Sequence, residues 1–347
     1  MTHQLEQIRG VRPSSSVPTL EMVAAAAGVS RSTVSRVVNG SPKVRPEVVD
    51  SVNEAISKLN YTPNRAARSL ASRQTYAIAL VVPEDASRFF GDPYFASVVQ
   101  GITSRLEASD YVLNLLVASS DPNQKTRRYL RGGNVDGALV VSHHVGDQDL
   151  VELNETIPVV FGGRPSLPDL GHGYYVDVDN VGGSRLATEH LIRRGARRIA
   201  TIAGPSDMPA GIDRLLGWRQ VMTAHGLADD AVVHGDFTSP GGARAVAELL
   251  DRHSDVDAVF VASDLMARGA VSTLTERGVA VPHDLAVMGY DDSPAATSGL
   301  LQLSTVSQPS HEMGARMATL LLDILAGREP ADHACVLPTS LVIRDSA

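Results

Sequence analysis

Apolar residues recur at helical spacing near the start of the chain. The first stripe, at positions i, i+3, i+4 and i+7, is Leu20, Val23, Ala24 and Ala27. Gly28-Val29 is a turn signal, and Ser30 is a good N-cap for a second helix that would bury Val34, Val37 and Val38. A third helix is predicted after Pro46, with the stripe Val48, Val52, Ile56 and Leu59. Two short helices joined by a tight turn and braced by a third form a helix-turn-helix.

The outer face of the second helix is polar. It carries Arg31, Ser32, Ser35, Arg36 and Asn39. Arginine presents forked donors that match the edge of guanine, and serine makes shorter contacts to bases or phosphates. The pattern therefore favours a recognition helix in the major groove of DNA. Periodicity alone leaves a second interpretation open, a small three-helix bundle whose arginines are only solvated.

Charge separates this segment from the rest of the chain. Residues 1–75 contain 10 Lys and Arg against 5 Asp and Glu, a net charge of +5, whereas the whole chain carries −8. A basic module on an acidic body is the arrangement expected of a head that binds phosphates.

From residue 76 onward, short apolar runs alternate with helical patterns. Strands are predicted at 76–84, 111–119, 135–142, 157–164 and 174–180, and again at 198–203, 231–234, 257–261 and 285–289. Helices are predicted between them at 93–109, 124–133, 149–156, 180–194, 211–225, 241–253 and 264–277, and at 309–326. This alternation is typical of βαβ units. Two such runs predict an α/β protein with two similar open parallel sheets, whose ligands bind beyond the carboxyl ends of the strands.

Two segments, TLEMVAAAAGVSRSTVSRVVNG and LNYTPNRAARSLASR, resemble the head and hinge of the LacI/GalR family of bacterial transcriptional repressors. The resemblance continues through nearly the whole chain and leaves out only residues 1–17. It implies a helix-turn-helix head with a hinge helix, then a two-lobed effector domain of the type I periplasmic-binding-protein fold. The DNA contacts expected from the pattern and the resemblance are Thr19, Ser30, Arg31, Ser32, Thr33, Ser35, Arg36, Asn39, Asn64, Ala67 and Leu70.

The hinge is predicted to fold only on DNA. Pro63 blocks continuation of the third helix, and Asn64 can cap the short segment that follows, RAARSLAS. A helix of about two turns is marginal in water, so we expect it to form when two copies pair on an operator. The resemblance implies that Leu70 wedges into the minor groove, with Asn64 and Ala67 beside it. The alternative is a plain linker.

The domain organisation follows from the pattern and the resemblance together. We expect a disordered tail at 1–17, the DNA-binding domain at 18–62, a hinge at 63–75 and the effector and dimerisation domain at 76–347. The resemblance implies three crossings between lobes, near 177–180, 307–310 and 337. They assign 76–177 and 310–337 to the N-terminal lobe, and 178–309 and 338–347 to the C-terminal lobe.

Candidate effector contacts follow the ends of the predicted strands. The resemblance matches Arg214 in AGIDRLLGW and Asp291 in VMGYDD to sugar-contacting residues, and places Ser263 and Asp264 on the same wall. A guanidinium and a carboxylate together can bind vicinal sugar hydroxyls. An ordinary ion pair between loops is the alternative.

The first lobe offers a second group of candidates. They are Asp92 and Phe95 after the first strand, and His143 and Arg164 after later strands. Phe95 would stack on a sugar ring or, equally, pack its helix onto the core. The pair His143-His144 lacks a further ligand at helical spacing, so we expect no metal and no cofactor.

The function expected is that of a repressor that binds a palindromic operator as a homodimer and is released by a sugar. The segments FFGDPYF, VFGGRP, GPSDMPAGIDR and HGDFT resemble actinobacterial repressors of cellulose and β-glucoside utilisation, which implies cellobiose or a related sugar as the effector. Two alternatives are a regulator whose purine-like ligand strengthens DNA binding, and an extracytoplasmic sugar-binding protein. The second would need an export signal and no basic head.

Other functions find no support in the sequence. It contains no nucleophile elbow, phosphate-binding loop or dinucleotide fingerprint, so we expect no enzymatic activity. The N-terminal segment lacks the apolar core of a secretory signal, and no apolar run is long enough to span a membrane. A single cysteine, Cys335, suits a cytoplasmic protein.

Overall fold

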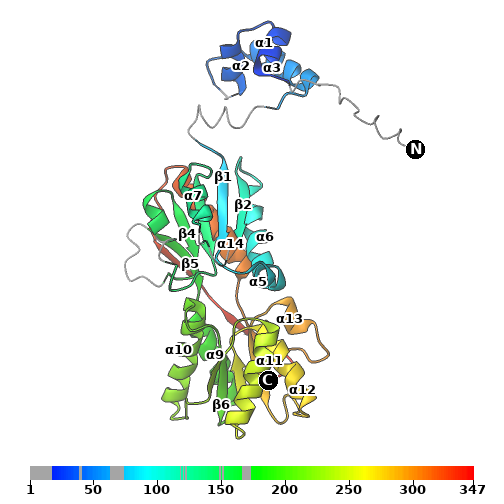
Figure 1. Cartoon of the computed structure of the whole chain (residues 1–347), viewed down its shortest axis with the longest axis vertical. Helices are drawn as coiled ribbons and strands as arrows, with labels where there is room; N and C mark the ends of the chain where they lie inside the picture. Colours follow the sequence, from blue (N-terminus) through cyan, green and yellow to red (C-terminus); the bar gives the residue numbers. More distant parts are fainter. Residues whose placement is uncertain are drawn as a thin grey trace, which may run out of the picture. The chain divides into compact units, whose positions relative to one another are not determined.

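The structure, a computed structural model, describes residues 18–38, 41–62, 74–117, 119, 121, 123–147, 150, 152–165 and 173–347. Contacts divide the chain into two compact units, Met1–Thr75 and Tyr76–Ala347, each with its own core. Figure 1 shows the small helical unit and the larger unit with its two sheets. No helix in the described ranges combines the length and the apolar character needed to cross a lipid bilayer.

The first unit is the predicted helix-turn-helix. Its helices are α1 (Leu20–Ala27), α2 (Arg31–Val38) and α3 (Pro46–Leu59). Gly28 ends α1 in the left-handed conformation, at φ 65°, which glycine adopts without a steric penalty. Val23, Val34 and Val52, one from each helix, are fully buried together. The apolar spacing in the sequence therefore corresponds to the real core.

The second unit begins with a parallel sheet in the spatial order β11-β5-β4-β3-β1-β2. Its strands are β1 (Ala77–Val82), β2 (Val112–Val117), β3 (Gly137–Val141), β4 (Val159–Gly162), β5 (Tyr174–Val178) and β11 (Ala334–Leu337). Side chains alternate along β1: Ile78, Leu80 and Val82 pack under α6 (Pro93–Leu106) and α14 (Ser310–Leu325). The other face packs against α7 (Lys125–Arg131). We call these elements the first lobe.

A second sheet repeats the design in the order β12-β10-β9-β8-β6-β7. Its strands are β6 (Ile199–Ala203), β7 (Val232–His234), β8 (Ala258–Val261), β9 (Ala286–Asp291), β10 (Ser304–Ser307) and β12 (Ser340–Val342). Its helices are α9 (Asn180–Arg193), α10 (Pro209–Ala224), α11 (Ser239–Arg252), α12 (Asp264–Glu276) and α13 (Pro294–Thr297). The strands pair in parallel except β12, which runs antiparallel to β10. We call these elements the second lobe.

Three crossovers connect the lobes. The chain leaves the first sheet after β5 and enters α9, returns from β10 to α14, and passes from β11 to β12. In Figure 1 the orange α14 lies beside α6 in the first lobe, although its sequence follows the second lobe. The first and third crossovers run side by side, since Asp179 N–H donates to the Leu337 carbonyl at 2.9 Å.

Several elements differ from the sequence expectation. The segment after β1 contains a helix, α5 (Ala86–Gly91), rather than a loop. Strands β10, β11 and β12 are additional, and so is α13. The predicted helix at 149–156 lies partly outside the described residues and contains the 3₁₀ turn η1 (Leu153–Glu155).

Candidate DNA interface and candidate ligand pocket

Helix α2 presents a polar surface on the side opposite its buried Val34. Arg31, Ser32 and Arg36 are exposed. Ser30 begins the helix: its Oγ accepts the Thr33 N–H at 3.2 Å and lies 2.8 Å from both the Ser32 and Thr33 hydroxyls. The network fixes the first turn, so the exposed side chains project from a rigid element.

Two other predicted DNA contacts have local partners. The Thr19 Oγ1 accepts the Met22 N–H at 3.3 Å and caps α1. Arg31 lies 3.0 Å from Glu21, with more than half of each side chain exposed. A pair so exposed contributes little to stability, so Arg31 can exchange it for a phosphate or a base. Asn39, Asn64, Ala67 and Leu70 lie outside the described residues.

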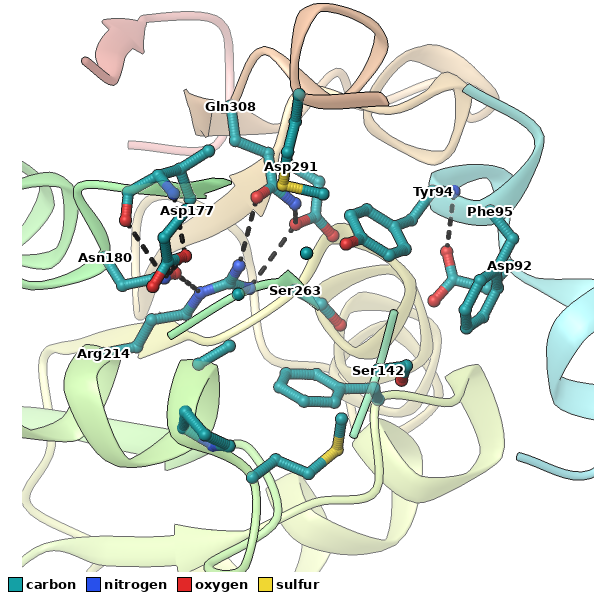
Figure 2. A pocket seen from close by; sticks show the side chains of 18 of the residues that line it. Asp92, Tyr94, Phe95, Ser142, Asp177, Asn180, Arg214, Ser263, Asp291 and Gln308 are labelled. Atoms are coloured by element: carbon teal, nitrogen blue, oxygen red, sulfur yellow. Dashed lines mark hydrogen bonds and ion pairs between the residues drawn. The ribbon is translucent and has the colours of Figure 1, made fainter. Parts of the chain in front are cut away.

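A pocket in the second unit is lined by both lobes at the carboxyl ends of their strands (Figure 2). Six of the eight predicted effector residues line it: Asp92, Phe95, His143, Arg214, Ser263 and Asp291. Residues far apart in sequence thus meet because parallel strands deliver their following loops to one edge. The predicted cleft exists, although which of these side chains bind a ligand stays a prediction.

Arg214 is the central cation of the pocket, and 5% of its surface is exposed. Its Nε donates to Asn180 Oδ1 at 2.9 Å and its Nη1 to the Ala262 carbonyl at 2.7 Å. The same Nη1 also lies 3.4 Å from Asp291 Oδ1, and Nη2 lies 3.4 Å from Gln308 Oε1. The guanidinium also stacks 3.7 Å over the ring of Tyr290. These contacts compensate a buried charge that would otherwise be costly.

Two carboxylates flank this guanidinium, as Figure 2 shows. Asp291 accepts the Gln308 amide at 2.6 Å, and burial raises its pKa well above the ordinary value despite the nearby Arg214. Asp177 accepts the backbone N–H groups of Arg164 and Val178 at 2.9 and 2.7 Å. Its pKa is also raised by burial. Asp291 adopts a φ of 118°, which is unfavourable for a residue with a side chain, so the pocket holds this position under strain.

The first lobe supplies Asp92, Phe95 and His143 to the pocket. Asp92 caps α6 by accepting the Tyr94 N–H at 2.9 Å, and burial raises its pKa. Phe95 is 1% exposed and contacts the rings of Phe89 and Tyr94, so it packs into the core while reaching the pocket wall. Burial lowers the pKa of His143, whose Nδ1 has no hydrogen-bond partner among the described residues.

Two predicted residues are not among those that line the pocket. Arg164 points to the second lobe and pairs with Asp213 at 2.9 Å. Asp264 is fully buried: its two oxygens accept the Thr305 hydroxyl at 2.6 Å and the Ser293 N–H at 2.8 Å. Burial raises the pKa of Asp264 to about 6. It fastens α12 to β10 and the loop after β9.

Sequence reasoning did not select several other pocket residues. They are Arg88, Ser142, Asn180, Met208, Phe237 and Gln308. Asn180 and Gln308 follow strands β5 and β10, so the strand-end rule applied to them as well. Strand β10 was not predicted because its sequence, STVS, is mostly polar. Among the described residues, no cluster of three or more His, Cys, Asp or Glu side chains is arranged to hold a metal ion.

Comparison with known proteins gives two family matches. Residues 19–64 match the model for bacterial regulatory proteins of the lacI family, and residues 188–347 match that for periplasmic binding protein-like domains. The HTH-type transcriptional regulator CelR of Thermobifida fusca is 46% identical over 333 residues, covering 95% of this chain and 98% of the relative.

Two solved structures are similar over the same extent. A transcriptional regulator CelR–cellobiose complex superposes with a TM-score of 0.76 at 44% identity, covering 95% of this chain and all of that one. The lac repressor dimer bound to operator and the anti-inducer ONPF gives a TM-score of 0.83 at 30% identity, covering 95% and 98% of the two chains.

Asp291→Asn tests the electrostatics of the pocket. A carboxyl group whose pKa is raised in the folded state stabilises the protein at low pH, and this contribution is lost as pH rises from about 4 through the folded-state pKa. Asparagine does not ionise. The unfolding free energy of the variant relative to wild type should therefore increase between pH 4 and 7, by about 1.4 kcal/mol for each unit by which the pKa is raised. The melting temperature of the variant relative to wild type should increase over the same range.

Thermal unfolding followed by circular dichroism measures this difference. The exposed Asp229→Asn serves as the control and should show no such trend. A difference for Asp291→Asn that is constant or falls with pH contradicts the assignment.

Proposed function

This chain belongs to the LacI family of bacterial regulatory proteins, and we propose that it represses transcription at a palindromic operator until a sugar of the cellobiose class enters its pocket. The family and the named relatives are transcriptional regulators and repressors rather than enzymes. Its head is the DNA-binding element, and α2 is the recognition helix. The head also disfavours the alternative of an extracytoplasmic sugar-binding protein.

The chemistry of the pocket supports a neutral polyhydroxyl ligand. Arg88 and Arg214 line it together with the carboxyl groups of Asp92, Asp177 and Asp291, so the lining is not built around one kind of charge. Sugar hydroxyls both donate and accept hydrogen bonds, and so match guanidinium and carboxylate groups alike. Phe237 and Tyr94 add ring faces against which a pyranose can pack. The similar structure titled as a CelR–cellobiose complex favours cellobiose within this class.

The observation that carries the proposal is the position of Arg214. It bonds Asn180, at the first crossover, and lies 3.4 Å from Gln308, at the second. A sugar bound to Arg214 therefore acts on the segments that set the relation between the lobes. Ligand binding shifts the lobes only by the difference in its affinity for the two arrangements. We propose that the sugar-bound arrangement releases the operator, whereas a purine-like corepressor would strengthen operator binding.

Dimerisation and location complete the proposal. A single helix-turn-helix buries too little DNA surface for tight binding, and a palindrome requires two heads related by a two-fold axis. The similar lac repressor structure is a dimer on its operator, which supports a homodimer here. We expect the protein to act in the cytoplasm, where its operator lies.

Arg36→Ala tests the recognition helix. Loss of a forked contact to a base should weaken operator binding by about 1–3 kcal/mol, roughly 5- to 150-fold, and should reduce binding to random DNA far less. Fluorescence anisotropy with a palindrome selected by the wild-type protein measures both. Arg105→Ala, on α6, removes the same charge outside the head and should leave operator affinity unchanged. Equal losses on operator and random DNA would contradict base recognition by Arg36.

Arg214→Lys tests the effector site. Wild-type protein in cellobiose at 100 times the Kd should gain about 2.7 kcal/mol of stability, visible as an increase of several degrees in melting temperature. Lysine cannot bridge the same partners, so the variant should lose most of this increase. Arg219→Lys, an exposed position on the same helix, should retain it. No increase in the wild-type protein would reject cellobiose, and a full increase in Arg214→Lys would reject the site.

A further inference from the structure

The segment Asp207–Asp213, at the start of α10, meets three separate parts of the first lobe. Arg88 of α5 contacts the sulfur of Met208 at 3.7 Å. His144, after β3, pairs with Asp207, and Arg164, after β4, pairs with Asp213. The two ion pairs lie at the ends of this segment, and Met208, Pro209 and Ala210 between them line the pocket.

The pair Arg164–Asp213 is bidentate. Arg164 Nη2 lies 2.9 and 3.1 Å from the two carboxylate oxygens, and Nε lies 3.4 Å from one of them. The Asp213 side chain is only 15% exposed, whereas that of Arg164 is 44% exposed. A forked pair with a mostly buried carboxylate is stronger and more directional than an exposed one.

The pair His144–Asp207 is held in place by a buried carboxylate on the other side of the His144 ring. His144 Nδ1 lies 2.8 Å from Asp207, and its Nε2 lies 3.3 Å from the buried Glu84. Glu84 is itself held by Arg88 and by the Ser142 hydroxyl, each at 2.7 Å. Beside the ring, Val145 N–H donates to the Asp207 carbonyl at 2.8 Å, so the main chains of the two lobes are also joined.

We propose that Arg164–Asp213 and His144–Asp207 form an interlobe clasp that holds the lobes closed and sets how long the effector stays bound. Arg164 and Asp213 act as positioning residues, because neither lines the pocket. The three crossovers join the lobes covalently and remain intact when the lobes separate. The clasp contacts run from one lobe to the other, so opening must break them.

A clasp of this kind has a kinetic signature. Contacts that exist only when the lobes are closed must break before the ligand leaves, and in the sugar-free protein they must also break before it enters. Their loss should therefore increase the dissociation rate of the effector, by about two- to fivefold for one pair, and should not slow its association. A residue that binds the sugar directly also determines which sugar binds, whereas loss of a clasp residue changes the dissociation rate of every sugar by the same factor.

Hydrogen exchange of the sugar-free, full-length protein tests the clasp without any ligand. The Val145 amide exchanges when the lobes open, whereas the Gly163 amide, bonded to the Val176 carbonyl within the first lobe, does not depend on opening. Arg164→Gln and Asp213→Asn should each accelerate exchange of the peptide containing Val145 and spare that containing Gly163. Exchanging the charges, Arg164→Asp with Asp213→Arg, should restore protection.

A matched control is available in the first lobe. Arg127 and Glu152 form an ion pair at 3.1 Å between elements of one lobe, so Arg127→Gln removes the same charge without touching the lobe interface. It should leave Val145 exchange unchanged. Unchanged exchange in both clasp variants, or failure of the charge exchange to restore protection, would overturn the proposal.

Measurement of the dissociation rate of the effector rests on the proposed function and uses cellobiose as the probe. Stopped-flow displacement should show faster dissociation from Arg164→Gln and Asp213→Asn than from wild type or Arg127→Gln. If wild-type protein does not bind cellobiose, the proposed ligand is wrong, and the exchange measurement still decides the clasp. Slower association or altered preference among sugars in the clasp variants would assign Arg164 to the pocket and contradict the clasp.

Discussion

The buried guanidinium of Arg214 is the interaction on which the second unit depends. Taking this charge out of water costs several kcal/mol unless acceptors surround it, and removing one partner of a buried pair typically costs about 3–5 kcal/mol. The acceptors come from Asn180, Ala262, Asp291 and Gln308, which follow or end strands β5, β8, β9 and β10. The Arg214 side chain therefore connects the ends of four strands through its hydrogen bonds.

The same requirement explains why the pocket and the crossovers are coupled. A group that binds Arg214 must share it with Asn180 and Gln308, both of which stand where the chain passes between lobes. Asp177 is part of this arrangement, because it accepts Asn180 Nδ2 at 3.1 Å and the backbone N–H of Arg164. One hydrogen-bond network therefore connects the pocket with the crossovers, and the proposed binding of a sugar would act on the lobes through it.

Much of this architecture could be predicted from the sequence, for physical reasons. The apolar stripe of α3 and the runs of β1 and β6 are strong signals, because burial imposes a fixed period on them. The strand ends then located Ser263, and the family resemblance located Arg214 and Asp291. The pattern could not reveal β10 or β12, whose residues are partly polar, nor α5, which is a short helix. It could not show that Arg164 turns to Asp213, because that depends on how close the two lobes stand.

The most direct test of the central claim measures operator and sugar binding as one linked equilibrium. Operator affinity is determined with and without saturating cellobiose, and cellobiose affinity with and without saturating operator. The account predicts that cellobiose weakens operator binding and that operator weakens cellobiose binding by the same factor, as linkage requires. Operator affinity that is unchanged or increased at saturating cellobiose would contradict it.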